Sequence, residues 1–266
     1  KYPNFAVLFQ VGDFYEVFYD DAPLVARVLD IRLTSRSKED AVPIPMCGVP
    51  IASIGNHIPT LVSAGLCCVL VSQVTQAGKG VAIKREISRI ITPGVRYEGD
   101  GLDSRDANYI ASIFLSPGGG SGCIVAADVS TSQLRFIRVE SIDQAIDCIK
   151  SLSLREIVLP VSIGSKRIDP TGEWLGSAKT NAKNFGAHVV ERSLQNETLE
   201  ERSSKLATHL IAAEYLHKQI AELSPEDLQA VSVLIDYLED IQVGERLKFS
   251  NIAICDDSRL VALDAT

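Results

Sequence analysis

The first part of the chain alternates short apolar runs with segments whose apolar residues recur every three or four positions. Short apolar or alternating runs predict strands, and the longer spacing predicts helices that pack on one face. Phe5–Phe9 is predicted as a strand that ends at Gly12 and Asp13. From Phe14 to Leu29 the spacing predicts a helix, with Asp13 and Glu16 forming its capping box.

Polar residues and prolines interrupt this pattern after residue 34. Ser35–Val42 is polar and predicts a loop, whereas the prolines at positions 43, 45 and 50 exclude a helix. The next predicted elements are a helix at Ile58–Ala64 that Gly65 stops, and strands at Cys67–Val74 and Lys84–Thr92. Residues 1–98 therefore predict a small α/β domain with a mixed sheet.

A polar segment, residues 99–106, predicts a linker to a second pattern. That pattern begins with three strand-like runs whose short connections indicate an antiparallel meander. The predicted strands are Tyr109–Leu115, Cys123–Val129, Gln133–Val139, Glu156–Leu159 and His188–Glu191, with a strand-like end at Ile252–Leu263; the predicted helices are Ile142–Leu152, Leu199–Leu223 and Pro225–Ile241, and the stretch around Trp174 is predicted as irregular. Three strands, a helix, a strand and terminal helices are typical of the ribonuclease-H-like order.

Composition and charge change this picture in one respect. With 46% hydrophobic residues the 266-residue chain can bury a sizeable core, and no apolar stretch approaches the ~18 residues of a membrane-spanning helix. The net charge of −8 argues against a nucleic-acid binder on average. However, residues 1–98 carry ten basic and nine acidic residues, a balance of +1, and the acidity belongs to the remainder. Either two modules with different partners or ordinary surface variation accounts for this asymmetry.

Few residues carry recognisable chemistry of their own. The six cysteines form no C-x-x-C pair, which indicates buried reduced thiols rather than a metal or disulfide framework. Gly118–Gly122 lies between two predicted strands without the lysine and hydroxyl of a phosphate loop, so it predicts a hairpin connection. Asp128 ends a strand, where either a structural role or the first carboxylate of a two-metal nuclease is open. The four histidines are scattered, without a base–nucleophile pairing.

The segment from Phe9 to Tyr19, FQVGDFYEVFY, is the most informative. Its ordinary interpretation is a capped helix start with Phe14 and Phe18 packed in the core. However, several collinear segments resemble the MutS family of bacterial DNA mismatch-repair proteins. The similar segments are Phe9–Ala22, Leu29–Thr34, Pro43–Pro50 and Arg85–Val95, followed by weaker ones at Asn108–Ile113, Ala127–Ser132, Leu234–Gln242 and Ala262–Thr266.

The resemblance implies a mismatch-binding domain at residues 1–98, a linker at 99–106, a ribonuclease-H-like connector without nuclease activity at 107–242, and the start of a core or lever region at 243–266. In the family, a Phe-x-Glu motif enters the minor groove. By position, Phe14 would stack on the mispaired base and Glu16 would hydrogen-bond to it. Arg36 matches a family arginine, Lys38 is added from its place in the same loop, and Val11 stands where the family often has a methionine near the DNA.

The resemblance also implies a wider setting. The chain, which begins without a methionine, is expected to be an excised piece of a cytoplasmic, nucleoid-associated protein. The full-length protein would be a homodimer that hydrolyses ATP with Mg²⁺ and binds a MutL-like partner through the connector, while the piece itself would be a monomer without cofactors. A protein-interaction module without DNA binding and a metal-dependent nuclease at Asp128 remain the alternatives.

One geometric condition follows from the Phe-x-Glu spacing. Residues two apart point the same way in an extended chain but about 200° apart on a helix. If Phe14 and Glu16 both reach DNA, the backbone there is extended or only entering a helix.

Overall fold

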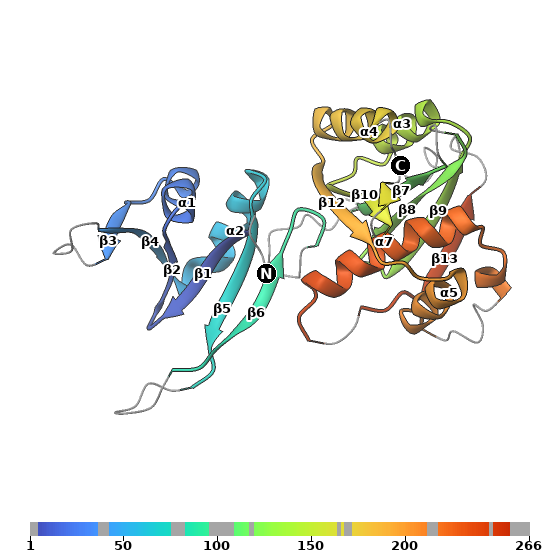
Figure 1. Ribbon diagram of the computed structural model, residues 1–266. Helices are drawn as coiled ribbons and strands as arrows, with labels where there is room; N and C mark the ends of the chain where they lie inside the picture. The colour runs from blue at the N-terminus through green and yellow to red at the C-terminus, as the bar shows by residue number, and fades with distance from the viewer. Residues whose placement is uncertain are drawn as a thin grey trace. The chain divides into compact units, whose positions relative to one another are not determined.

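The chain folds around two sheets, one in each of two units, Lys1–Asp106 and Ala107–Thr266 (Figure 1). The computed structural model describes residues 5–36, 43–75, 83–95, 109–116, 120–163, 166–167, 172–211, 218–244 and 247–255. The predicted linker and residues 37–42 of the predicted Ser35–Val42 loop lie outside these ranges; its first two residues, Ser35 and Arg36, belong to a strand, so that part of the prediction is wrong.

The first unit contains a six-stranded mixed sheet in the order β3-β4-β2-β1-β5-β6. β1 and β5 run parallel, and the other neighbouring strands are antiparallel. The strands are β1 (Phe5–Val11), β2 (Phe14–Phe18), β3 (Thr34–Arg36), β4 (Ile44–Pro50), β5 (Cys67–Gln73) and β6 (Arg85–Ile91). The helices are α1 (Asp21–Leu29) and α2 (Ile54–Ser63), the latter preceded by a 3₁₀ turn at Ile51–Ser53.

The predicted helix from Phe14 is wrong at its start, because residues 14–18 form β2 and α1 begins at Asp21. Phe14 and Phe18 are four apart, a spacing that puts two residues on one face of a helix and also on one face of a strand. The tertiary context decides between the two, since β2 lies between β1 and β4 and pairs antiparallel with both. Tyr15 and Val17 then alternate into the core, as a half-buried strand requires.

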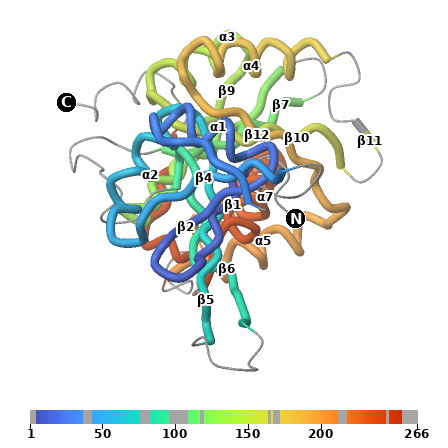
Figure 2. Tube along the Cα trace, turned by 90° about the vertical axis from the view of Figure 1, so that its left-hand side faces the viewer, coloured from blue at the N-terminus to red at the C-terminus, as the bar shows by residue number. Residues whose placement is uncertain are grey.

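Both helices of the first unit pack on one face of its sheet (Figure 1). α2 starts one turn earlier than predicted, so that Ile54 joins Ile58 and Leu61 against the core. The opposite face, which carries Phe14 and Glu16, is called the open face below, because no described helix of this unit covers it. Figure 2 shows β5 and β6 extending side by side beyond the ends of the other strands.

The second unit has a seven-stranded sheet in the order β11-β10-β7-β8-β9-β13, with β12 paired to β10. β7, β8 and β9 form the predicted antiparallel meander, and β10 and β12 continue it in parallel, which gives the ribonuclease-H-like order. The strands are β7 (Tyr109–Leu115), β8 (Gly122–Asp128), β9 (Gln133–Val139), β10 (Glu156–Ile163), β11 (Lys166–Arg167), β12 (His188–Leu194) and β13 (Asn251–Cys255). The helices are α3 (Ile142–Ser151), α4 (Glu173–Asn184), α5 (Leu199–Thr208) and α7 (Pro225–Ile241).

Helix α7 is the central helix of the second unit and lies against β7 and β8, while α3 and α4 lie together on the other side of the sheet (Figure 1). It begins at Pro225, as predicted, and the structure adds a capping box formed by Ser224 and Asp227. The fully buried Asp227 side chain also accepts hydrogen bonds from Arg138, from Nε at 3.1 Å and from Nη2 at 2.8 Å. One carboxylate thus caps the helix and ties it to β9.

Three predictions for the second unit need correction. The stretch around Trp174 is helical in α4, where Trp174, Ala178 and Ala182 form a buried stripe four residues apart. The helix predicted from Leu199 ends at Thr208, because Leu210 leaves it to bridge Phe249. Residues 251–255, which the resemblance assigned to a following region, pair with β9 in this sheet.

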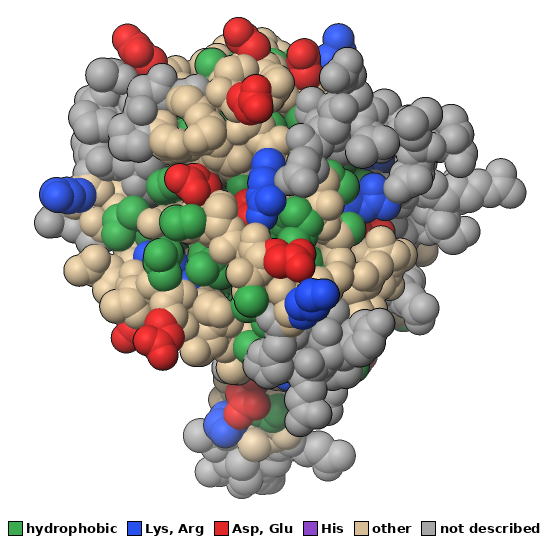
Figure 3. Space-filling model, turned by 90° about the vertical axis from the view of Figure 1, so that its right-hand side faces the viewer, with side chains coloured by type: hydrophobic (Ala, Val, Ile, Leu, Met, Phe, Trp, Pro, Cys, Tyr) green, Lys and Arg blue, Asp and Glu red, His purple; other side chains and the backbone are tan. Residues whose placement is uncertain are grey.

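Part of the acidic surplus of the second unit lies on α3. Figure 3 shows acidic side chains at the top of the view, where α3 lies, and α3 exposes Asp143 and Asp147. Five of the six cysteines are buried, as predicted, and all six are free in the structure. Among the described residues, no helix is long and apolar enough to cross a membrane.

Candidate nucleic-acid interface

The hairpin of β1 and β2 presents the predicted site residues at its tip. Gly12 occupies the left-handed region at φ 58°, which glycine adopts without steric cost and which allows the tight turn. Phe14 follows the turn and lies opposite Val11 in the strand register. Its side chain is 47% exposed, which rules out the ordinary interpretation that Phe14 packs in the core.

The alternation along β2 sends Phe14 and Glu16 to the same, open face. Tyr15 and Val17 point into the core between them, and the Tyr15 hydroxyl lies 3.2 Å from the Ser72 hydroxyl of β5. The backbone is therefore extended at both residues of the Phe-x-Glu pair, which meets the geometric condition that the spacing set.

Gly48 keeps the space beside Glu16 open. It lies opposite Glu16 in the pairing of β2 with β4. A Cβ at position 48 would lie 3.2 Å from the Tyr15 carbonyl oxygen and 3.5 Å from Cγ of Glu16. A side chain there would press on the Tyr15 carbonyl and cover part of the Glu16 side chain, so the glycine leaves more of Glu16 accessible from the open face.

Of the two predicted cations, the structure describes one. Arg36 ends β3 and is exposed, and its guanidinium carbon lies 5.6 Å from the centroid of the Phe18 ring, a cation–π distance. Lys38 lies outside the described residues. The ring contact holds the Arg36 side chain over the open face.

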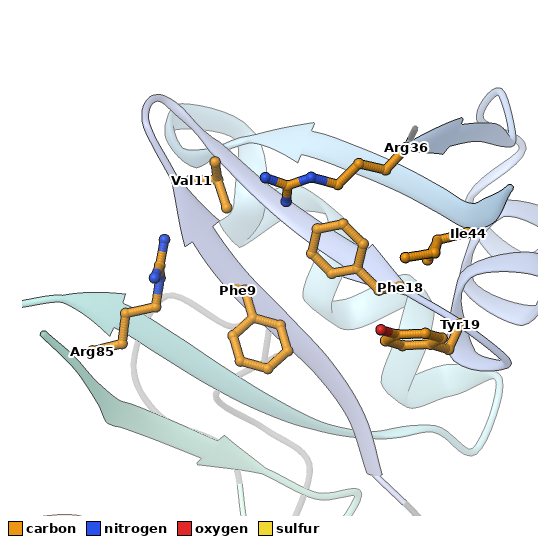
Figure 4. A pocket seen from close by; sticks show the side chains of 7 residues that line it. All are labelled: Phe9, Val11, Phe18, Tyr19, Arg36, Ile44 and Arg85. Atoms are coloured by element: carbon orange, nitrogen blue, oxygen red, sulfur yellow. The ribbon is translucent and has the colours of Figure 1, made fainter. Parts of the chain in front are cut away.

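A pocket of about 470 Å³ opens on this face beside the Phe-x-Glu pair (Figure 4). We call it the aromatic pocket. Its lining residues are Phe9, Val11, Phe18, Tyr19, Arg36, Ile44 and Arg85. The Phe9 and Phe18 rings lie 6.3 Å apart at an angle of 51°, and Figure 4 shows them with Tyr19 around the opening.

The pocket contains residues that the sequence did not single out. Phe9 could have been found from the alternation of β1 once residues 14–18 are known to be its partner strand. Arg85 carried no signal, since it comes from β6, and its Nε donates to the carbonyl of Gln10 at 3.2 Å. With three aromatic rings and two guanidinium groups among its seven lining residues, the pocket suits planar rings and anions.

Asp128, the sequence's candidate for nuclease chemistry, has a structural role. Asp128 is 6% exposed, and its Oδ1 accepts hydrogen bonds from the Ser130 amide at 2.9 Å, the Ser130 hydroxyl and the Thr131 amide. It belongs to no group of three metal-ligating side chains in the part of the chain that the structure describes. Its carboxylate therefore holds the turn between β8 and β9.

The glycine-rich segment joins two antiparallel strands, as predicted. β7 ends at Leu115 and β8 begins at Gly122, where the two residues face each other in the register. Gly122 permits this close approach, because a Cβ there would lie 2.1 Å from the Phe114 carbonyl oxygen. A strand rather than a helix follows the glycines, so the segment does not fit the phosphate groups of ATP.

Two family models of known proteins match almost the same residue ranges as the two units. Residues 1–100 match the family model MutS domain I, and residues 108–252 match MutS domain II. A DNA mismatch repair protein MutS from Syntrophobacter fumaroxidans is 37% identical over 160 residues, which cover 60% of this chain and 18% of the relative. One from Staphylococcus haemolyticus is 29% identical over 268 residues, covering 100% of this chain and 29% of the relative.

A third relative with the same name, from Anaeromyxobacter sp. strain Fw109-5, is 34% identical over 169 residues, or 64% of this chain. The matched region makes up 19%, 18% and 21% of the first three curated relatives. The chain thus spans about a fifth of their length.

Proposed function

The chain belongs to the MutS family of DNA mismatch repair proteins, and on this premise we propose that its first unit recognises mispaired duplex DNA. Phe14 inserts between base steps from the minor groove and stacks on the mispaired base. The Glu16 carboxylate accepts a hydrogen bond from the edge of that base. The second unit serves as the connector.

A single observation carries the proposal: Phe14 and Glu16 project together from an extended strand next to a tight turn. Phe14 is 47% exposed, so its ring can enter a base step without vacating the core. The neighbouring Tyr15 and Val17 are buried and anchor the strand, which fixes the backbone from which the ring projects. A backbone that is fixed before it meets the DNA reduces the conformational entropy lost on binding.

Deformability supplies the discrimination in this proposal. Unstacking a step costs a few kcal/mol, and a mispaired step resists less than a matched one. Stacking of the base on the Phe14 ring contributes about 1–3 kcal/mol of binding free energy, whichever base it is. Mispaired sites therefore bind more tightly than matched duplex, without a separate reading of each base.

Affinity depends on cations that contact phosphates. Arg36 lies on the open face, and we assign phosphate contacts to Arg36 and Lys38. We assign a groove contact to Val11. Because residues 1–98 have a net charge of only +1, we expect weak binding, and two phosphate contacts predict a shallow salt dependence with a log–log slope of about −2.

Fluorescence anisotropy at low salt tests the proposal with a G·T duplex and the matched duplex. We expect the wild-type chain to prefer the G·T duplex, and Phe14→Ala to bind both equally. Phe185→Ala is a matched control, because Phe185 is a phenylalanine of the second unit with a similar exposure of 40%. A preference for G·T that survives in Phe14→Ala would refute the wedge.

The remaining expectations concern the full-length protein. We propose that it binds ATP and Mg²⁺ outside the residues described here, forms a homodimer and binds a MutL-like partner through the connector, and that this chain does not hydrolyse ATP. A cytoplasmic, nucleoid-associated location stays a prediction. No second function is put forward, because the Asp128 carboxylate is engaged in its turn.

A further inference from the structure

Helix α5 lies against α7 in the second unit, and it is held there largely by polar side chains (Figure 1). The residues that α5 and its C-cap turn inward are Arg202, Leu206 and His209, which are 1%, 0% and 1% exposed. They follow the spacing of one helix face, where a helix packed by apolar contact would carry apolar residues. Two of the three instead bury nitrogen groups, and such groups require hydrogen-bond partners.

Helix α7 supplies partners for this inward face. Asp236 of α7 pairs with Lys205 of α5. One turn further along α7, Oε1 of Glu239 lies 3.4 Å from Nε2 of His209. We call this contact the charged seam, which consists of Lys205 and His209 on one side and Asp236 and Glu239 on the other.

The surroundings of the His209 ring determine which protonation state fits the charged seam. Its Nδ1 lies 3.1 Å from the Lys205 carbonyl oxygen and 3.2 Å from the Thr208 hydroxyl oxygen. That hydroxyl donates to the same carbonyl at 2.7 Å, so both neighbours of Nδ1 present lone pairs to it. Nε2 faces the Glu239 carboxylate, which is also an acceptor. Neutral imidazole has one N–H and satisfies one side, whereas imidazolium has two and satisfies both.

The other charged groups near the seam balance one another among the residues that the structure describes. Lys205, paired with Asp236, also lies 3.4 Å from Glu197, which precedes α5. Lys248, which precedes β13, donates from Nζ to the Thr208 carbonyl at 2.6 Å. The hydrogen bonds of the ring, rather than a surplus of either charge, therefore decide its protonation. The cations are Arg202, Lys205 and Lys248, and the carboxylates are Glu197, Asp236 and Glu239.

We propose that the charged seam is a latch that closes when His209 takes a proton from solvent. The imidazolium donates to the Lys205 carbonyl and to Glu239 at once, which ties the end of α5 to α7. When the proton returns to water, one of the two contacts brings lone pairs together, and α5 detaches more often while α7 stays packed in the core. The His209 carbonyl also accepts from the Phe249 amide at 2.7 Å, so the latch holds the segment that leads into β13.

Hydrogen exchange of the 266-residue chain tests the latch, with peptides of α5 and α7 followed separately by mass spectrometry. Each measured rate is divided by the intrinsic rate at the same pH, and α7 serves as the internal reference. We expect the protection of α5 relative to α7 to fall about 5- to 10-fold from about pH 5.5 to about pH 8.5, a range that brackets the ordinary titration of histidine. This factor corresponds to the loss of about one hydrogen bond from a charged donor.

Three variants assign the effect to the ring and its partner. Glutamine does not titrate, so in His209→Gln the relative protection of α5 should not change with pH. Glu239→Gln keeps an acceptor oxygen without the charge at a side chain that is 33% exposed, and it should reduce the pH dependence. His57→Gln is the matched control, because it removes a histidine of the first unit and should leave the dependence unchanged. Fluorescence of the buried Trp174 checks that each variant is folded.

The outcomes are distinct. Equal relative protection of α5 at the two pH values in the wild-type chain overturns the latch, as does a pH dependence that survives in His209→Gln. If α5 and α7 lose protection together at high pH, the whole unit opens and the latch is overturned as well. Should His209→Gln not fold, the wild-type chain and Glu239→Gln decide, and an undiminished dependence in Glu239→Gln then refutes the proposal.

Discussion

Replacing Asp227 with alanine should destabilise the second unit strongly. The carboxylate is fully buried, and its Oδ2 accepts from Nε of Arg138 at 3.1 Å, from Nη2 of Arg138 at 2.8 Å and from the Ser224 amide at 2.8 Å. The substitution removes a helix cap and a charge-assisted pair in one step, and it leaves the Arg138 guanidinium without its partner carboxylate.

The magnitude follows from burial. Breaking a fully buried ion pair costs about 3–5 kcal/mol, and losing a helix cap costs about 1 kcal/mol. The Arg138 side chain is 33% exposed and can turn toward water, which reduces the first figure. We therefore expect Asp227→Ala to lower the free energy of unfolding by about 2–4 kcal/mol. With a typical urea dependence, the midpoint shifts by about 1–2 M.

Tryptophan fluorescence during urea unfolding measures this in the second unit alone. The chain has one tryptophan, Trp174, which is buried in α4. Asp240→Ala is the matched control, because Asp240 lies on the same helix and pairs with Arg192 but is 47% exposed. Exposed pairs contribute about 0–1 kcal/mol. If the two variants shift the midpoint equally, burial does not determine the strength of these ion pairs.

Two further predictions concern titration. Hydrogen bonds from the backbone and side chain of Thr198 lower the pKa of Glu201 below 4.5. The stabilisation by its carboxylate is therefore present above pH 4.5 and is lost as the pH falls through the lowered pKa. Glu201→Gln should make the stability of the second unit less sensitive to acid in the same fluorescence assay, and an unchanged acid response would contradict the assignment. Burial, with a smaller effect of Asp21, raises the pKa of Cys68 to about 12. Alkylation of the folded chain at mildly alkaline pH, followed by mass spectrometry, should therefore modify the partly exposed Cys255 far sooner than Cys68. Equal rates of modification would contradict the raised pKa.

Local pattern predicted half of the strands of the first sheet, namely β1, β5 and β6, and most strands of the second, because these are short apolar or alternating runs bounded by turn residues. The prediction failed where one spacing of apolar residues fits both the helical and the strand period. Phe14 and Phe18 share a face in either a helix or a strand, and only the flanking strands β1 and β4 decide between these. Trp174 was missed for a related reason, since its buried stripe continues through the small residues Ala178 and Ala182, which a search for large apolar residues does not detect.

The candidate site was predictable only in part. The Phe-x-Glu pair came from the resemblance to MutS, and the extended backbone that it requires conflicted with the helix predicted from periodicity. The aromatic pocket could not be predicted, because it joins Phe9 to Arg85 across the sheet and depends on the left-handed backbone of Tyr19. Neither the strand order nor a positive φ at a tyrosine can be read from local sequence.

The pairing of β13 with β9 has a consequence for the newly synthesised chain. Ser250 and Ser132, which flank this pair, are 118 positions apart. At about 5–20 residues per second, the edge of β9 waits roughly 6–24 s on the ribosome for its partner strand. During that time its unpaired amides and carbonyls can add a strand from another chain. A truncation at residue 242 would make this exposure permanent, so a shortened second unit should aggregate where the longer chain remains dispersed.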